Sequence, residues 1–126
     1  MTNITGYELP FDLDLTGEER ALLRRGLNEW GGPARPTDAL AVMLGFADKN
    51  DLWRSGEYLR KLLQAQESMT ATDWHRILFA VEVVFVSDRW GSGWDWSITT
   101  GFSDEATIGI LRSIQRKLSR RLRSLN

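Results

Sequence analysis

The sequence predicts a mainly α-helical single domain, a bundle of about five helices spanning residues 1–126. The length of 126 residues suits one domain. Apolar residues recur at three- and four-residue spacing in five segments, and a capping residue precedes each segment. Hydrophobic residues make up 42% of the chain and charged residues 26%, which is ordinary for a globular protein and argues against disorder.

The first fifteen residues are predicted to form an extended N-terminal arm. Within them apolar residues alternate with other residues, as in a half-buried strand, and the apolar ones are Leu9, Phe11, Leu13 and Leu15. Trp94, Trp96 and Ile98 alternate with polar residues in the same way. We therefore expect a short two-stranded β ribbon, made of residues 11–15 and 94–98, beside the helices.

The first helix is expected to begin at Thr16, because Thr16 and Glu19 have the spacing of a capping box. A Gly-Gly-Pro sequence at residues 31–33 ends it. Its buried face comprises Leu22, Leu23, Leu27 and Trp30. A second helix is expected from Thr37, and the residues that it buries are Leu40, either Met43 or Leu44, and Ala47.

Three further helices complete the predicted bundle. The third begins at Asn50 or Asp51, and its inner face comprises Leu52, Leu59, Leu62 and Leu63. The fourth, capped by Thr70 or Thr72, extends from 73 to about 88 and is apolar on most sides, so it should be central. The fifth begins at a Ser103 cap, and its apolar stripe comprises Ile108, Leu111, Ile114, Leu118, Leu122 and Leu125.

Residues 90–103 form a connection between two predicted helices that is rich in tryptophan and glycine. Trp90, Trp94 and Trp96 are three of the chain's six tryptophans. A connection of this length in a small domain is usually functional or specially packed. We therefore predict a partner-binding site in this connection, made of Trp94, Asp95, Trp96, Ser97, Thr99 and Thr100.

Two interpretations of this segment stay open. In the first, the alternation places the indoles of Trp94 and Trp96 on one side, where they anchor a partner while the polar residues donate and accept hydrogen bonds. Trp90, at the end of the fourth helix, then belongs to the core. In the second, the tryptophans fill the open side of a small helical core, since aromatic residues dominate cores as well as interfaces.

The sequence favours a non-enzymatic protein without a cofactor or metal. There is no cysteine, and His75 is the one histidine, so a zinc-type cluster is not expected. His75 and Glu82 share a helix face but lie about 10 Å apart along the axis, too far for direct contact. Glu82 interrupts an apolar run, and we expect it on an exposed strip rather than buried beside a cation such as Arg89. No phosphate-binding or nucleophile motif occurs.

The charges are separated along the chain, although the net charge is only −1. The charged residues among the first nineteen are all acidic, and those among the last fifteen are all basic. The two ends could attract each other, or the basic end could contact a partner. The small net charge predicts no general attraction to nucleic acid or to anionic membranes. The N-terminus has no apolar signal core and no segment is long enough to cross a membrane, so we expect a cytoplasmic protein.

Residues 41–54 have a spacing of small and apolar residues that allows two helices to pack closely, with Ala41, Gly45 and Leu52 at the key positions. This stretch resembles the helix-turn-helix of the AraC-type regulators, and the resemblance implies a DNA-binding module within residues 37–65. The second helix of the pair lacks the basic face that a duplex reader normally needs, since its charged residues are Asp48, Lys49, Asp51, Arg54, Glu57 and Arg60. A plain helix-turn-helix in a bundle is therefore favoured.

The leading functional hypothesis is a small cytoplasmic, non-enzymatic domain that binds another protein through the tryptophan segment. This profile is typical of bacterial immunity and antitoxin proteins, an analogy of profile alone. One alternative is a DNA-binding helix-turn-helix regulator using residues 37–65. Another is a small-molecule sensor or enzyme with a tryptophan-lined pocket. The sequence predicts neither the identity of the partner nor the oligomeric state.

Overall fold

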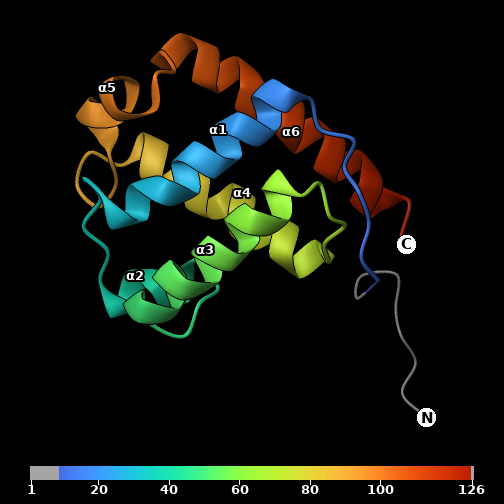
Figure 1. The fold of residues 1–126 in the computed structure, drawn as a ribbon, viewed down its shortest axis with the longest axis horizontal. Coiled ribbons are helices and arrows are strands. Elements are labelled where there is room, and N and C mark those ends of the chain that lie inside the picture. Colours follow the sequence, from blue (N-terminus) through green and yellow to red (C-terminus); the bar gives the residue numbers. More distant parts are fainter. Residues whose placement is uncertain (1–8, 126) are drawn as a thin grey trace.

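The computed structural model describes residues 9–125, and this part of the chain is a helical bundle (Figure 1). Its α-helices are α1 (Gly17–Asn28), α2 (Asp38–Met43), α3 (Lys49–Gln64), α4 (Ala71–Val86), α5 (Trp96–Thr100) and α6 (Asp104–Arg123). Two short 3₁₀ helices, η1 (Glu29–Gly31) and η2 (Gly93–Asp95), extend α1 and precede α5. The mainly helical fold class is confirmed. Within the described residues, no helix has both the length and the apolar character needed to cross a membrane.

Four of the five predicted helix starts are confirmed by their caps. The third lies earlier than predicted, because α3 begins at Lys49 with Asp48 as its cap rather than at Asn50 or Asp51. The Thr16 hydroxyl accepts from the Glu19 amide at 3.1 Å, and the Glu19 carboxylate accepts from the Thr16 amide at 2.8 Å. Thr37, Thr70 and Ser103 cap α2, α4 and α6. These caps satisfy amides that have no partner inside the helix, which explains why each helix begins where it does.

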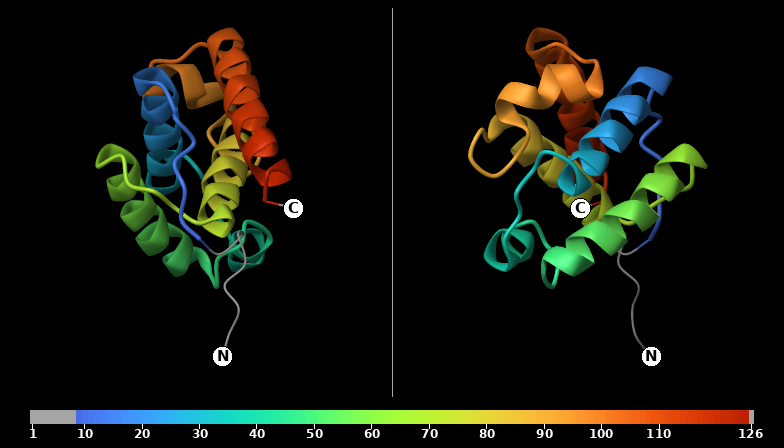
Figure 2. Two further views of the ribbon diagram at one scale, coloured as in Figure 1. Left: turned by 90° about the vertical axis from the view of Figure 1, so that its right-hand side faces the viewer. Right: turned by 60° about the vertical axis from the view of Figure 1, so that its left-hand side comes forward.

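Helix α4 lies in the middle of the bundle, in contact with α1, α3 and α6 (Figures 1 and 2). Its inward side chains are fully or almost fully buried: Trp74, Ile77, Leu78, Val81 and Val84. Gly26 allows α1 to approach closely, because a Cβ atom there would lie 2.7 Å from a methyl carbon of Val81. The prediction that the most apolar helix is central is therefore confirmed.

Details of two predicted faces are wrong. On α2, Leu40 is buried as predicted, and of the two alternatives Met43 and Leu44 it is Leu44 that is buried. The predicted Ala47 is exposed, and Ala41 and Phe46 are buried instead. The reason is that α2 ends at Met43 and Gly45, at φ 98°, reverses the chain so that Phe46 enters the core. On α6, Ile108 is half exposed and Thr107 is buried in its place.

The predicted β ribbon is wrong. Phe11 forms an isolated antiparallel bridge with Met69, with N···O distances of 2.9 and 3.0 Å, and residues 94–98 belong to η2 and α5. Trp74 adds an indole hydrogen bond to the Phe11 carbonyl at 3.1 Å. Apolar and other residues alternate in this segment because an extended chain turns successive side chains to opposite sides. Here one side faces the helices, without a partner strand.

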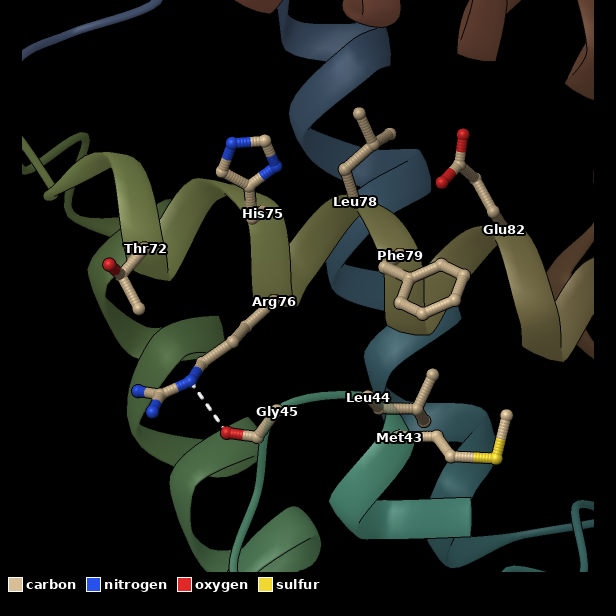
Figure 3. A pocket seen from close by; sticks show the side chains of 9 residues that line it. All are labelled: Met43, Leu44, Gly45, Thr72, His75, Arg76, Leu78, Phe79 and Glu82. Carbon is tan, nitrogen blue, oxygen red and sulfur yellow. Dashed lines mark hydrogen bonds between the residues drawn. The ribbon is translucent and has the colours of Figure 1, made fainter. Parts of the chain in front are cut away.

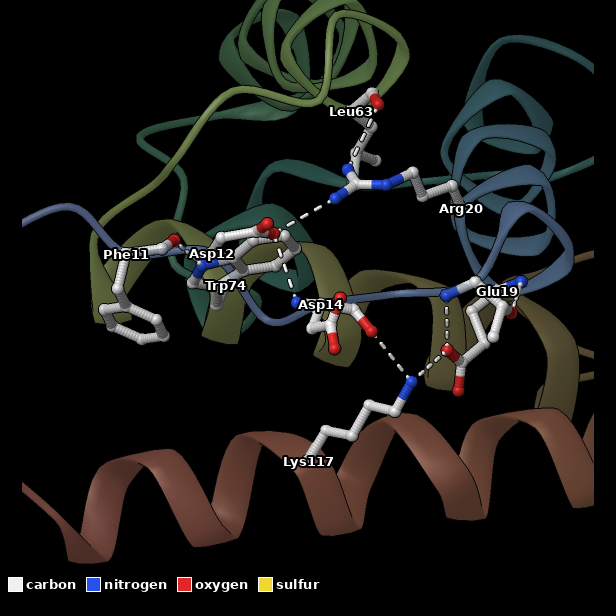
Figure 4. A network of polar contacts seen from close by, with 9 residues as sticks. Phe11, Asp12, Asp14, Glu19, Arg20, Leu63, Trp74 and Lys117 are labelled. Atoms are coloured by element: carbon white, nitrogen blue, oxygen red, sulfur yellow. Dashed lines mark hydrogen bonds and ion pairs between the residues drawn. The ribbon is translucent and has the colours of Figure 1, made fainter.

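Residues 1–8 of the predicted arm lie outside the described residues, and residues 9–15 are held against the bundle by a network of charged side chains (Figure 4). Lys117 of α6 donates to the Glu19 carboxylate at 2.6 Å and to the Asp14 carbonyl at 3.0 Å. Arg20 of α1 donates to Asp12 at 3.1 Å and to the Leu63 carbonyl of α3 at 3.2 Å. The ion pair between Lys117 and Glu19 shows that the acidic beginning and basic end of the chain do attract each other.

Candidate functional site

The tryptophan segment, residues 90–103, lies at one end of the bundle beside the C-terminal ends of α1 and α4 (Figure 1). Its backbone packs closely against the C-terminal end of α4 and the residues that follow it. A Cβ atom at Gly91 would lie 2.4 Å from the Val84 carbonyl oxygen, and one at Gly93 would lie 2.4 Å from the Asp88 Cα. The Ser92 amide also donates to the Val84 carbonyl at 2.7 Å. The glycines are therefore required by close packing, and the segment has a defined conformation.

Trp96 is part of the core. Its side chain is 0% exposed, its indole N–H donates to the Thr107 hydroxyl at 2.8 Å, and its ring meets Phe85 edge-on with centroids 5.3 Å apart. Thr100 is also buried and donates to the Trp96 carbonyl at 2.6 Å. Both residues were predicted to contact a partner, and in this structure neither is accessible to one.

Trp94 lies on the outside, with 85% of its side chain exposed. The expectation that Trp94 and Trp96 share one side is wrong because the segment is helical, and residues two apart on a helix point about 200° apart. Ile98, four residues on, is 77% exposed and lies on the same side as Trp94. Asp95 and Ser97 are exposed as well. We call these four residues, Trp94, Asp95, Ser97 and Ile98, the Trp94 surface.

Ile98 was absent from the predicted site, although a signal for it existed. A separation of four residues places two side chains together both in a strand and in a helix, so Trp94 and Ile98 share a side under either interpretation. A separation of two residues does so only in a strand. Whether Trp96 shares a side with Trp94 therefore depends on the secondary structure assigned to the segment, whereas for Ile98 it does not.

Thr99 fastens the segment to η1. Its hydroxyl donates to the Glu29 carboxylate, and the Ser92 hydroxyl donates to the same oxygen at 2.9 Å. The Glu29 side chain is buried, so two hydrogen bonds to one of its oxygens offset part of its desolvation. Thr99, predicted to contact a partner, is exposed, and its hydroxyl is bonded within the chain.

Trp90 packs against the core but remains partly exposed, which agrees in outline with its predicted place. The Arg89 guanidinium lies over its ring, 4.6 Å from the centroid, and its carbonyl accepts from the Arg35 amide at 2.8 Å. These contacts join the beginning of the tryptophan segment to the turn that follows η1.

A second candidate site is a pocket of about 540 Å³ between α2 and α4, lined by nine residues that include His75 and Glu82 (Figure 3). Glu82 is half-buried and accepts from the Gln115 amide at 2.6 Å. Among the described residues Glu82 forms no ion pair. It therefore matches neither expectation, since it is neither fully exposed nor buried beside a cation. The walls of this pocket contain no tryptophan. Along residues 9–125, no three His, Cys, Asp or Glu side chains are grouped to hold a metal ion.

Helices α2 and α3 do form a helix-turn-helix pair. Ala41 and Leu52 are buried, and Gly45 makes the turn at φ 98°, as the predicted close packing requires. The acidic residues at the start of α3 are used locally. Asp51 accepts from the Ala47 amide at 2.8 Å and the Ser55 hydroxyl at 2.7 Å, and these two bonds lower the pKa of its carboxyl. The Asp51 carboxylate is therefore engaged within the helix pair, at the start of α3.

Comparison of the chain with protein-family models, curated proteins and solved structures found no match.

Proposed function

We propose that this protein is an interaction domain that binds a partner protein through the Trp94 surface. The observation that supports the proposal is an indole 85% exposed on a segment with a defined conformation. A tryptophan side chain offers a large apolar area, and tryptophan is enriched among residues whose truncation costs about 2 kcal/mol or more of binding free energy. Ile98 extends the apolar area on the same side.

The rigidity of the segment strengthens this proposal. The Trp94 amide donates to the Asp88 carboxylate at 2.8 Å, and Trp96, two residues later, is anchored in the core. Close packing of Gly91 against Val84 fixes the preceding turn. Little backbone entropy would then be lost when a partner covers the indole, which favours affinity.

The charges around the indole define the partner that we propose. Asp88 and Asp95 are exposed beside Trp94, and the nearby Arg89 is stacked on Trp90. A complementary partner would present an apolar socket for the indole with cationic residues at its rim. A compact, cysteine-free domain with an exposed tryptophan on a segment of defined conformation fits a cytoplasmic immunity or antitoxin role, in which the partner would be the protein that it neutralises.

The test compares capture of partners from native lysate by the wild-type chain, Trp94→Ala and Tyr58→Ala. Tyr58 is the matched control because it is an exposed aromatic residue on α3, outside the tryptophan segment. We expect a protein that the wild type and Tyr58→Ala retain and that Trp94→Ala loses. Binding of the purified partner should weaken by about 2 kcal/mol in Trp94→Ala, roughly thirtyfold in Kd.

Equal affinity of the captured protein for Trp94→Ala and the wild type would contradict the proposal. So would equal losses in the two variants, because a general loss of aromatic surface would then explain the result. Unfolding of each variant in urea provides the control for folding, since both side chains are largely exposed and neither substitution should change stability by more than about 0.5 kcal/mol.

A further inference from the structure

A small pocket of about 190 Å³ lies between α1 and α3, with Thr99 of α5 in its wall. Four cationic side chains line it. Arg24 and Arg25 come from α1, and Arg60 and Lys61 come from α3. The one carboxylate among the lining residues is Glu29 of η1, and the other lining residues are Asn28 and Gln64.

Two of the four cations have acceptors within the protein. Arg60 donates to the Asn28 side-chain oxygen at 2.8 Å and pairs with Glu57 at 3.0 Å. Arg25 donates to the Thr100 carbonyl at 3.0 Å and lies over the Phe102 ring. In the part of the chain that the structure describes, the side chains of Arg24 and Lys61 form neither an ion pair nor a hydrogen bond.

This excess of positive charge has a physical consequence. Like charges around one small pocket repel each other, and among the described acidic residues Glu29 alone lines this pocket. An anion that enters the pocket would relieve the repulsion. Its binding sites would be held in place by the packing of α1 on α3.

We propose that this pocket binds the phosphoryl group of a small phosphate ester. A phosphoryl dianion has up to two negative charges and three acceptor oxygens, so it can engage several cations, whereas one arginine can satisfy a carboxylate. The amides of Asn28 and Gln64 add neutral donors. The volume is smaller than a typical pocket for drug-sized ligands, which are about 300–1,000 Å³, and limits the ester to a small molecule.

Glu29 determines the orientation of this ligand. One carboxylate oxygen accepts from Ser92 and Thr99, and the other has no hydrogen bond among the described residues. That oxygen would repel an anion but would accept from a hydroxyl group. The ester should therefore bear a hydroxyl that faces Glu29 while its phosphoryl group faces Arg24 and Lys61.

The test measures binding of glycerol 3-phosphate and inorganic phosphate by calorimetry and by NMR titration at constant ionic strength. We expect saturable binding of both, tighter for glycerol 3-phosphate, with amide shifts at Asn28 and Thr99. Arg24→Gln and Lys61→Gln should each weaken binding at least tenfold. Arg116→Gln, which removes an exposed cation of α6 outside the pocket, should leave binding unchanged.

The Glu29→Gln variant provides an effect of opposite sign. Loss of the negative charge should tighten the binding of inorganic phosphate and remove the preference for the ester. Absence of saturable binding would overturn the proposal. An equal loss of binding in Arg116→Gln would also overturn it, because the effect would then be one of net charge. Succinate binding as tightly as glycerol 3-phosphate would overturn the assignment to phosphate esters. The Arg24 and Lys61 variants decide the matter even if Glu29→Gln does not fold, since Lys61 is exposed and Arg24 is only half-buried.

Discussion

At the scale of single residues, Trp94 and Trp96 show how two neighbouring tryptophans acquire opposite roles. Trp96 is fully buried and its indole N–H is bonded to Thr107, whereas Trp94 lies in solvent. The distinction follows from one local fact, the helical conformation of η2 and α5. It places a core side chain and an exposed side chain two residues apart in the sequence.

This separation predicts different consequences of truncation. Trp96→Ala should destabilise the fold by about 3–5 kcal/mol, because it empties a large core volume and leaves the Thr107 hydroxyl without its donor. Trp94→Ala should cost no more than about 0.5 kcal/mol, and Trp90→Ala should fall between them since Trp90 is partly buried. Urea unfolding of the three variants measures the order. A Trp94 variant less stable than the Trp96 variant would contradict the structure.

At the scale of elements, α2 and α3 show how a helix-turn-helix is built by close packing of two helices. Close approach needs Ala41, Gly45 and Leu52, and all three have the expected environment. The acidic residues at the start of α3 serve as its cap and as acceptors for local amides: Asp48 caps the helix and Asp51 accepts from Ala47. Their role is local, which separates the motif from the function that its resemblance implies.

We therefore predict no specific binding of duplex DNA by this pair of helices. Fluorescence anisotropy with random and AT-rich duplexes at physiological salt should show at most weak, salt-sensitive association. Replacing Arg54 and Arg60 by Ala should weaken this association only by the small amount expected from the loss of two positive charges. A sub-micromolar, sequence-dependent complex that these substitutions abolish would establish DNA binding instead.

At the scale of the whole molecule, polar contacts join parts of the chain that are distant in sequence. The pair between Lys117 and Glu19 connects the last helix to the first, and Glu19 also belongs to the capping box of α1. Burial raises the pKa of the Glu19 carboxyl. Hydrogen bonds from Lys117, the Thr16 amide and Ser113 lower it by a larger amount, so the pKa is below the ordinary value of 4.5.

This shift predicts a loss of stability in acid. Because the folded-state pKa is below the unfolded one, the stabilising contribution of Glu19 is complete above about pH 4.5 and disappears as the pH falls through the folded-state pKa. Glu19→Gln should cost about 1–2 kcal/mol at pH 7 and much less at pH 3. Urea unfolding at both pH values measures the difference. Glu18→Gln, an exposed neighbour, should follow the wild type, and a cost of Glu19→Gln that is equal at both pH values would refute the argument.

The sequence alone determined the class of fold, the helix starts and most of the buried faces, because these depend on interactions within three or four residues. The Thr16–Glu19 capping box is such an interaction, and so is the apolar spacing of α4. Contacts between distant residues were decided only by the tertiary structure. Phe11 pairs with Met69 rather than with the tryptophan segment, and Ser92 and Thr99 converge on Glu29. No local pattern encodes these partners, since each depends on how complete helices pack.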